Sequence, residues 1–361
     1  PDHAVKTFEQ AKKVGQTDGQ ETNGHYVIYA SGPVRVSGEA ADAPISWTLP
    51  ETAYLCRYTG FTVYDKNGVP VSGTGEGGKG YTGELIELGS GANLVLGGED
   101  GGTIHIYGRR GIDSDTYNGD SLILIQEGAV LEIRDALLSR NNNTGTEGGE
   151  YEDALSGQGG AVRVEKGGDL IISGGSLTGL NAVSGSAVYV GGTMTLKNAP
   201  MIQGDVYLAK RDHAGTGGEE GETFIQVETG YQPSGYNETD SGTKLSVRVE
   251  DDFNGRKVVQ YPKETPPTPA EMEYYQLEDY ILSVYDFLQN PADLSELTLQ
   301  KRQAYFLDGT AGNDDNDGST PDQALKTLKG LYEKLKNSQD TAGAVVYVVN
   351  GVTLEDETVL V

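Results

Sequence analysis

Cysteine, proline, basic residues and long apolar runs are all scarce in this sequence. A single cysteine, Cys56, among 361 residues excludes an internal disulfide and a cysteine-based zinc site. Proline is outnumbered by glycine, 13 to 52, so the chain is neither collagen nor a proline-rich disordered segment. No run approaches the roughly 18 apolar residues of a membrane-spanning helix, so we expect no membrane insertion.

Positive charge is low as well. The 27 Lys and Arg residues stand against 54 Asp and Glu, which gives a net charge of −27. A chain with this balance is repelled by phosphate backbones and by anionic membrane surfaces. We therefore expect no nucleic-acid partner. The apolar share of 36% is still sufficient for a folded core.

The abundant glycine belongs to an internal repeat. Alternating apolar pairs recur along the chain, and each is followed by a glycine-containing turn, a second pair and a third short apolar segment. Each pair is typical of a short strand. The first pairs are Ile86/Leu88, Ile123/Ile125, Val162/Val164 and Val188/Val190, and the second pairs are Leu94/Leu96, Leu131/Ile133, Leu170/Ile172 and Met194/Leu196.

The spacing of this repeat predicts stacked three-strand coils. The second pairs are offset by 37, 39 and 24 residues, which we interpret as a basic coil of about 24 residues with long insertions in two turns. Neighbouring residues of a strand face opposite sides of its sheet. We therefore expect outward-facing side chains at His105, Arg163, Glu165, Tyr189 and Thr195.

Two stretches carry a resemblance to a known family. Residues 159–177 begin Gly-Gly-Ala-Val-Arg-Val, and residues 186–196 read Ser-Ala-Val-Tyr-Val-Gly-Gly-Thr-Met-Thr-Leu. Over residues 20–260 the chain resembles the right-handed parallel β-helix (pectin-lyase-like) modules of large bacterial surface proteins, particularly those of Gram-positive gut organisms. The resemblance implies an all-β fold and an extracellular location at the bacterial cell surface. It leaves the activity open, because the superfamily contains polysaccharide lyases, glycosidases and non-catalytic adhesins.

The opening of this module is repeated near the C-terminus. A short amphipathic helix near residues 5–14 precedes a strand at 26–32, and a helix near 327–332 precedes a strand at 345–351. Each helix is expected to cap the end of a stacked core. We therefore expect a first β-helix over residues 1–261 and the truncated opening of a second over 304–361, in a fragment of a longer chain.

Residues 262–303 are expected to connect these modules. The segment 262–269 contains four prolines and is typical of an extended spacer. An amphipathic helix that ends at Asn290 is predicted next, because apolar residues recur there every three or four positions. They are Tyr274, Leu277, Ile281, Tyr285 and Leu288.

The sequence contains no recognisable catalytic motif. The four histidines are far apart and outside metal-binding spacings, and there is no nucleophile elbow, Walker loop or Rossmann fingerprint. The lyases of the resembled superfamily use acidic calcium ligands and an Arg or Lys base on one sheet. The outward strand positions here are chemically mixed, which leans against an enzyme; they are Glu87, Leu124, Arg163, Tyr189, Val95, Glu132, Ile171 and Thr195.

Only one motif in the sequence suggests a cofactor, and that cofactor is calcium. Asn313, Asp315, Asp317 and Gly318 match the first half of an EF-hand loop, but Ala324 stands where the bidentate acid belongs. Asx turns, in which the side chain bonds to its own backbone, account for this segment equally well. We therefore expect no cofactor.

Two insertions are expected to form the functional surface. Residues 107–118 and 141–153 interrupt successive coils at one corner, and binding residues tend to lie on loops held by a rigid scaffold. The candidate binding residues are Tyr107, Arg109, Arg110, Asp113, Asp115, Tyr117, Asn142 and Tyr151. Arginines, tyrosines and carboxamides of this kind suit contact with protein or glycan. A second patch, Tyr54, Arg57 and Tyr58, is more typical of a core or cap.

Three functions remain open at this stage. The first is an adhesin-like segment whose β-helix presents loops to a host or matrix glycoprotein or glycan, such as a mucin or an immunoglobulin. The alternative is a polysaccharide lyase or glycosidase that acts on a glycan along the β-helix face. The third is a spacer whose loops bind nothing. We favour the first, as a monomeric segment, because the net charge of −27 suits a soluble, extended surface structure.

Overall fold

The computed structural model describes about two thirds of the chain and divides it into two compact units. The first unit comprises residues 1–251 and 258–276, and the second comprises residues 252–257 and 277–361. The described residues are 10–11, 13, 26–37, 45–47, 53–57, 83–98, 103–108, 120–143, 157–210, 223–235, 244–250, 252–277, 285–336 and 344–352.

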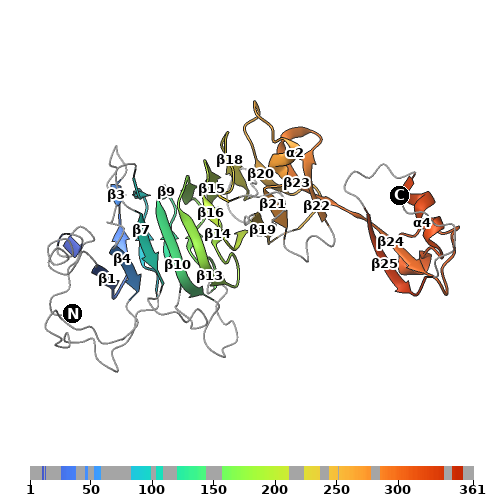
Figure 1. The fold of residues 1–361 in the computed structure, drawn as a ribbon, viewed down its shortest axis with the longest axis horizontal. Coiled ribbons are helices and arrows are strands. Elements are labelled where there is room, and N and C mark those ends of the chain that lie inside the picture. Colours follow the sequence, from blue (N-terminus) through green and yellow to red (C-terminus); the bar gives the residue numbers. More distant parts are fainter. Residues whose placement is uncertain are drawn as a thin grey trace, which may run out of the picture. The chain divides into compact units, whose positions relative to one another are not determined.

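The first unit consists of three parallel sheets, which we call sheets A, B and C (Figure 1). Sheet A contains β1 (Tyr26–Ala30), β4 (Ala53–Arg57), β7 (Ile104–Tyr107), β10 (Ala136–Asn143), β13 (Ser176–Ala182) and β16 (Met201–Ile202). Sheet B contains β2 (Val34–Val36), β5 (Ile86–Leu88), β8 (Ile123–Ile125), β11 (Val162–Val164), β14 (Val188–Val190), β17 (Asp205–Leu208), β19 (Leu245–Val249) and β21 (Tyr275–Leu277). Sheet C contains β3 (Ile45–Trp47), β6 (Asn93–Leu96), β9 (Val130–Ile133), β12 (Asp169–Ile172), β15 (Thr193–Leu196), β18 (Ile225–Val227) and β20 (Lys257–Gln260).

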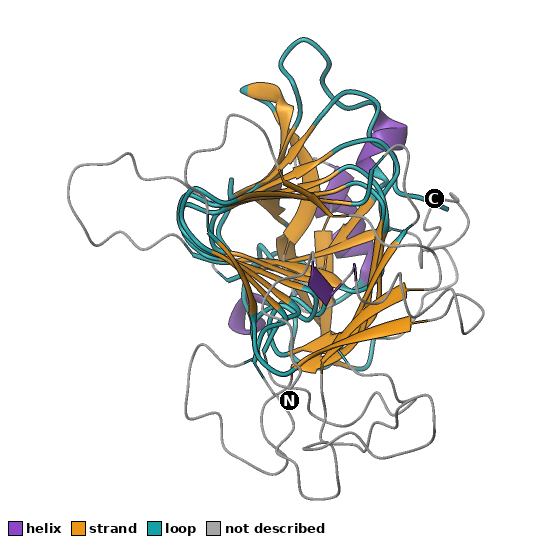
Figure 2. Cartoon of the chain, turned by 90° about the vertical axis from the view of Figure 1, so that its left-hand side faces the viewer, coloured by secondary structure: helices purple, strands orange, loops and turns teal. Residues whose placement is uncertain are grey.

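The order of the strands confirms a parallel β-helix of three-strand coils. From β2 to β16, the chain contributes one strand to sheet B, one to sheet C and one to sheet A before it begins the next coil. In the view from the N-terminal side, the strands lie behind one another in walls around the core (Figure 2). The register matches the predicted repeat, because Leu131 pairs with both Leu94 and Leu170, and Leu170 pairs with Met194.

The β-helix extends beyond the four coils that the repeat predicted. A further coil, β2 to β4, precedes them, and β17 to β20 continue sheets B and C after sheet A has ended at β16. Long segments separate these outer strands, so the repeat is difficult to recognise in the sequence there. The inward side chains of all coils form one apolar column, in which Leu94, Leu131 and Met194 are fully buried.

Glycine is required where the chain turns between sheets. Gly97 has φ +81°, a left-handed conformation that a residue with a Cβ atom rarely adopts. A Cβ atom at this position would lie 2.3 Å from the carbonyl oxygen of Asp135 in the next coil. The close stacking of coils therefore explains part of the glycine surplus.

A group of buried tyrosines lies near the last strands of the first unit. The hydroxyl groups of Tyr261 and Tyr275 lie 2.9 Å apart in a hydrogen bond. The ring of Tyr231 packs against those of Tyr274 and Tyr275, with centroid distances of 6.2 and 6.3 Å. These rings add an aromatic end to the aliphatic column of the core.

The predicted spacer and helix at residues 262–303 need correction. Residues 262–265 form a turn, in which the Thr265 N–H donates to the Pro262 carbonyl, and α2 (Pro269–Met272) is a single helical turn. The predicted amphipathic helix is wrong, because Tyr274, Leu277, Tyr285 and Leu288 fall in or beside strands rather than along a helix. Residue 281 lies outside the described residues.

An antiparallel hairpin replaces the second half of that predicted helix. It joins β22 (Tyr285–Asn290) to β23 (Asp293–Lys301). Asn290 and Pro291 therefore mark the hairpin turn, a role in which both residue types are common. The buried Ser295, Leu297 and Leu299 alternate along β23, and this period of two is the strand signal that outweighs the helical spacing.

The second unit also contains a small parallel sheet with a helix. β24 (Gln303–Asp308) pairs with β25 (Ala344–Asn350), and η2 (Pro321–Gln323) and α4 (Leu328–Lys336) lie between them in sequence. The predicted helix and strand of this second opening are confirmed by α4 and β25. Tyr305, Leu307, Leu325 and Leu331 form its core. That this sheet begins a second β-helix remains a prediction.

The first predicted opening, at residues 5–32, can be compared with the structure only in part. Its predicted strand is confirmed by β1. The predicted cap helix at residues 5–14 lies almost wholly outside the described residues, of which only 10, 11 and 13 are assigned, all as helix. The domain boundaries at residues 261 and 304 likewise remain predictions.

The acidic segment before η2 forms Asx turns, as one of its two interpretations predicted. Asn313 accepts a hydrogen bond from the Asp315 N–H, and Asp317 accepts one from the Ser319 N–H. Asp314 accepts from the backbone N–H groups of Lys326 and Thr327. These hydrogen bonds hold the pKa values of Asp314 and Asp317 below their usual range.

Candidate functional site

Three long segments start from one end of sheet A. β4, β7 and β10 are adjacent in the sheet, and Tyr107 at the end of β7 pairs with Cys56 of β4 and Ser139 of β10. The segments 58–82, 109–119 and 144–156 follow these three strands. The strands before the two predicted insertions are therefore adjacent, although β10 continues to Asn143, four positions beyond Ser139. The prediction that the insertions stand side by side concerns residues outside the described ones and stays a prediction.

Only two of the eight predicted binding residues belong to the described part of the chain. Tyr107 is half-buried on β7, and Asn142 is buried on β10, with 4% of its surface exposed. The other six, together with Tyr58 of the second patch, lie outside the described residues: Arg109, Arg110, Asp113, Asp115, Tyr117 and Tyr151.

Tyr107 belongs to a group of side chains on the outer face of sheet A, which we call the aromatic–arginine cluster. Its members are Tyr54 on β4, His105 and Tyr107 on β7, and Arg140 on β10. Ring centroids lie 4.9 Å apart for Tyr54 and His105, and 5.3 Å apart for Tyr54 and Tyr107. His105 Nδ1 lies 3.3 Å from the Tyr107 hydroxyl. The Arg140 guanidinium carbon lies 4.6 Å from the centre of the Tyr107 ring.

The strand pattern explains why these side chains meet. Ile104 and Ile106 are fully buried, so His105 and Tyr107 point outward from β7, as predicted for His105. The register places Tyr54 directly beside His105. The three aromatic rings thus form one outward surface at the corner from which the long segments leave.

Arg140 is held in an unusual backbone conformation. Its φ is +59°, and it is one of two non-glycine residues with positive φ in the described part of the chain. Gly179, which lies opposite Arg140 on β13, has φ +60°. A left-handed arginine is strained, and such strain is concentrated at functional sites. The kink directs the Arg140 side chain over the Tyr107 ring while the strand continues beyond it.

The electrostatics of the cluster favour a neutral tyrosine. Burial raises the pKa of the Tyr107 hydroxyl above its ordinary value of 10.0, and this effect outweighs the opposing attraction of Arg140. Tyr107 therefore remains a hydrogen-bond donor at neutral pH, next to a permanently charged guanidinium.

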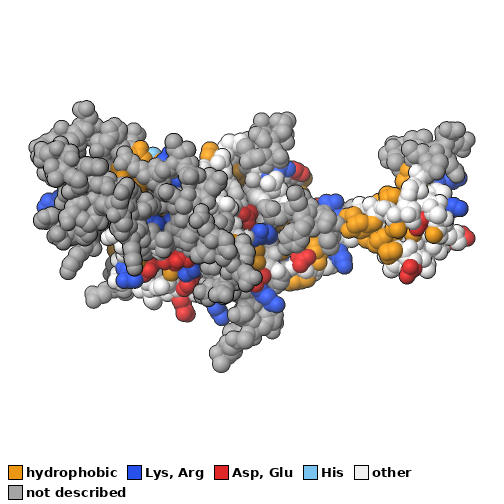
Figure 3. Space-filling view, turned by 90° about the horizontal axis from the view of Figure 1, so that it is seen from below, with side chains coloured by type: hydrophobic (Ala, Val, Ile, Leu, Met, Phe, Trp, Pro, Cys, Tyr) orange, Lys and Arg blue, Asp and Glu red, His pale blue; other side chains and the backbone are white. Residues whose placement is uncertain are grey.

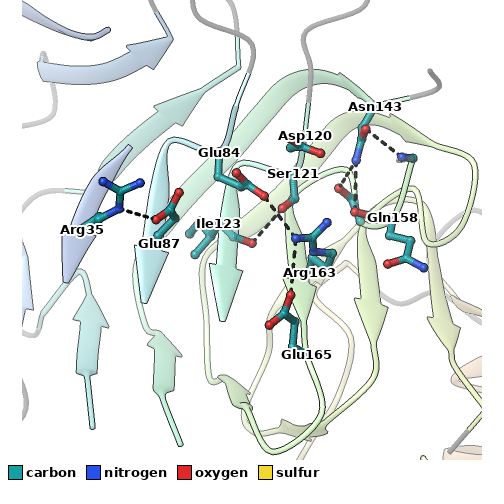
Figure 4. A network of polar contacts seen from close by, with 12 residues as sticks. Arg35, Glu84, Glu87, Asp120, Ser121, Ile123, Asn143, Gln158, Arg163 and Glu165 are labelled. Atoms are coloured by element: carbon teal, nitrogen blue, oxygen red, sulfur yellow. Dashed lines mark hydrogen bonds and ion pairs between the residues drawn. The ribbon is translucent and has the colours of Figure 1, made fainter. Parts of the chain in front are cut away.

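Asn141, Asn142 and Asn143 do not form the exposed loop that we predicted. They continue β10 and are all buried. The Asn141 amide donates to the carbonyl of Gly160 at 2.7 Å. The Asn143 amide donates to the carbonyl of Gln158 at 3.1 Å (Figure 4). Asn141 and Asn143 thus satisfy backbone groups where the chain turns toward sheet B, so their role is structural.

Arg57 is also structural, as the core interpretation of the second patch predicted. Its side chain is 1% exposed. Nε donates to the Gly83 carbonyl at 2.9 Å, and Nη1 donates to Asn141 Oδ1 at 2.7 Å. Nη2 donates to the carbonyls of Asp120 and Ser121 at 3.2 and 3.4 Å. One buried guanidinium thus joins residues of three successive coils.

A network of charged side chains lies on sheet B (Figure 4). Arg163 forms ion pairs with Glu84 at 3.4 Å and Glu165 at 3.5 Å. Burial raises the pKa of Glu84, with a further contribution from the negative charge of Asp120, although Arg163 acts in the opposite direction. Arg163 faces outward as predicted, but its side chain is only 12% exposed.

The outward row of sheet B continues from this network along one register position. Arg163 is followed by Tyr189 and Tyr207, whose rings stack with centroids 5.6 Å apart, and then by Arg248 over the Tyr207 ring. Leu124, which precedes Arg163, is buried. The row has no surplus of positive charge, because each of its arginines forms ion pairs with carboxylates: Arg163 with Glu84 and Glu165, and Arg248 with Asp205.

Comparisons with known proteins give no assignment for either surface. No protein-family model matches the chain, and no curated protein matches its sequence. Among the described residues, no helix is long and apolar enough to cross a membrane. In the same residues, no three His, Cys, Asp or Glu side chains come together in an arrangement that could hold a metal ion.

Proposed function

We propose that the chain is a ligand-binding segment of an extracellular bacterial surface protein, in which the β-helix holds binding loops at one corner. The observation that carries the proposal is that β4, β7 and β10, the strands before three long segments, are adjacent in sheet A. Long connections in a compact domain are uncommon unless they serve a function. A stack of paired strands keeps the starting points of such loops fixed.

The aromatic–arginine cluster supports this choice of surface. Tyrosine and arginine are enriched at the energetic centres of protein interfaces, and here they lie beside the origin of the loops. The resemblance to pectin-lyase-like modules of gut bacteria supports an adhesin-like role toward a host or matrix glycoprotein or glycan. Mucins and immunoglobulins are therefore the first ligands to test.

Replacement of the loops tests the proposal. Residues 109–119 and 144–156, exchanged for Gly-Ser linkers of equal length, are expected to weaken binding on an array of mucins, immunoglobulins and glycans by at least about tenfold. The matched control exchanges residues 211–222, which follow β17 in sheet B, and should leave binding unchanged. Equal binding by the native protein and the corner variant would contradict the proposal.

A polysaccharide lyase or glycosidase is the second candidate, and one observation favours it. The raised pKa of Glu84, together with Arg163 at 3.4 Å, gives sheet B a carboxyl group of the kind that acts as a general acid. Incubation with acidic polysaccharides, with and without calcium, distinguishes the candidates. New reducing or unsaturated ends that disappear in Glu84→Gln would identify an enzyme, whereas intact polymer supports a binding protein.

A further inference from the structure

We infer that the aromatic–arginine cluster is itself a binding site for an acidic sugar, and that protonation of His105 strengthens this binding. The inference rests on the proposed function, because it assigns a ligand class to the same corner. It differs in placing the specific contacts on the rigid strands β4, β7 and β10 rather than on the loops.

The first step concerns charge. Arg140 is exposed, and no carboxylate forms an ion pair with it among the residues that the structure describes. In a chain with a net charge of −27, an arginine of this kind is unusual. The preceding arginine in the sequence, Arg134, is by contrast paired with Glu132 at 2.8 Å. A guanidinium binds a carboxylate or sulfate through two parallel hydrogen bonds.

The second step concerns shape. The Tyr54 and His105 rings meet at an interplanar angle of 70°, and the His105 and Tyr107 rings at 79°. Their exposed parts offer an amphipathic surface with ring edges, a hydroxyl group and imidazole nitrogen. The apolar face of a pyranose ring packs on such a surface, and its acidic substituent then reaches Arg140. A sugar with both features fits better than a free anion.

The third step concerns strain. Arg140 occupies a left-handed conformation that glycine adopts at no cost. An arginine therefore stands at a position where the backbone favours glycine, as Gly179 shows on the neighbouring strand. Backbone strain of this kind clusters at functional sites, which fits a side chain that contacts a ligand.

The fourth step concerns pH. Among the residues that the structure describes, His105 contacts Tyr54 on β4 and Tyr107 on its own strand, and the residue beside it on β10 is the apolar Leu137. The charged member of the cluster, Arg140 on β10, packs over the Tyr107 ring. The titratable Cys56 on β4 is buried next to Tyr107. Asp135, which precedes β10, accepts a hydrogen bond from Thr103, which precedes β7. Histidine is the group here that ordinarily gains its charge near pH 6.5. Its protonation adds a second positive charge to the cluster that contains Arg140, so affinity for an anion rises as pH falls.

The test measures binding of sialyllactose and chondroitin sulfate to the full chain, with lactose and dextran as neutral counterparts. Sialyllactose carries a terminal carboxylate, whereas chondroitin sulfate is a repeating acidic polymer, so the two probes distinguish the source of the acidic sugar. We expect at least one acidic probe to bind about tenfold more tightly than its neutral counterpart. We also expect binding about fivefold tighter at about pH 5.5 than at about pH 7.5.

Three variants locate the site. Arg140→Gly removes the side chain and relieves the backbone strain, so it should fold at least as well as the native protein while acidic-sugar binding falls about tenfold. His105→Gln should retain binding at the higher pH and lose its pH dependence. Arg134→Gln, at an exposed arginine directly after β9, should change neither the acidic-sugar binding nor its pH dependence.

The outcomes separate this inference from the proposed function. Unchanged acidic-sugar binding by Arg140→Gly would overturn the inference, as would equal binding of acidic and neutral probes. If the native protein binds a mucin or an immunoglobulin through its loops but binds neither acidic probe, the inference fails while the proposed function stands. If the loop variant retains acidic-sugar binding and Arg140→Gly loses it, the inference is supported.

Discussion

Replacement of Arg57 by methionine is expected to lower the free energy of unfolding of the first unit by roughly 4 kcal/mol. The guanidinium donates hydrogen bonds to four buried or part-buried oxygens, those of Gly83, Asn141, Asp120 and Ser121. Methionine fills much of the volume but donates nothing. The cost arises because these acceptors remain buried without the guanidinium.

The single tryptophan makes this loss measurable where it occurs. Trp47 is buried on β3, in the same coil as Arg57 on β4, so its fluorescence reports the unfolding of that coil in urea. Arg35→Met is the matched control, because its side chain is 73% exposed and its ion pair with Glu87 contributes about 1 kcal/mol or less. A loss below about 1 kcal/mol for Arg57→Met would contradict the structural role assigned to Arg57.

A double-mutant cycle tests the contact between Arg57 and Asn141. Each single change removes the hydrogen bond of 2.7 Å between the Arg57 guanidinium and Asn141 Oδ1. The combined loss in Arg57→Met with Asn141→Leu should therefore be smaller than the sum of the two single losses, by at least about 0.5 kcal/mol. Strict additivity would show that the two side chains act independently.

Alkaline pH is expected to unfold the first unit through its buried tyrosines. Burial raises the pKa values of Tyr231, Tyr261 and Tyr275 far above the ordinary value of 10.0. In the unfolded chain these groups lose their protons near pH 10, whereas in the folded chain they retain them. The stabilisation is therefore fully present below about pH 10 and is lost as pH rises toward the folded pKa values, by up to about 4 kcal/mol per pH unit for three groups.

Urea unfolding at a series of pH values from neutral to strongly alkaline measures this slope. Tyr261→Phe should lower stability at neutral pH by about 1 kcal/mol, because the Tyr275 hydroxyl loses its partner. The same variant should reduce the alkaline slope by about one third. Tyr332→Phe, at a residue that is 41% exposed, is the control. An unchanged alkaline slope in Tyr261→Phe would contradict the account.

The coils could be predicted from the sequence because their signal is local. Each strand pair places two apolar residues on one face, and a glycine turn follows within a few residues, so Leu131, Leu170 and Met194 align without knowledge of the fold. The hairpin at β22 and β23 was missed because the short spacings between apolar residues there fit both the helical period of 3.6 residues and the strand period of two. The alternation of Ser295, Leu297 and Leu299 carried the information that decides between them.

The site was only partly predictable because it depends on register between strands that are far apart in sequence. Tyr107 was identified from its position beside an insertion, but its neighbours Tyr54 and Arg140 meet it only after two adjacent coils have stacked. Nothing in the sequence signals the positive φ of Arg140. The exposed loop predicted at residues 141–143 was wrong because asparagine is typical of loops, whereas here the residues continue β10 and the amides of Asn141 and Asn143 satisfy backbone carbonyls.

Strand β25, which is exposed at consecutive positions, contrasts with this site. Val346, Tyr347, Val348 and Val349 are exposed on β25, and Figure 3 shows hydrophobic side chains gathered on the C-terminal part of the chain. Exposed apolar strands are sites of strand pairing and aggregation. The binding experiments should therefore be carried out at low protein concentration, with the oligomeric state monitored.

Cysteine cross-linking across sheet C tests most directly whether the coils stack as parallel, in-register strands. Thr195 on β15 pairs with Gln226 on β18, whereas Glu132 lies two strands away from Thr195 on β9. In a Cys56→Ala background, Thr195→Cys with Gln226→Cys should form a disulfide under mild oxidation, because adjacent strands are about 4.8 Å apart. Thr195→Cys with Glu132→Cys should remain reduced, since the distance is about twice as large. Cross-linking of the second pair but not the first would contradict the stacked parallel β-helix.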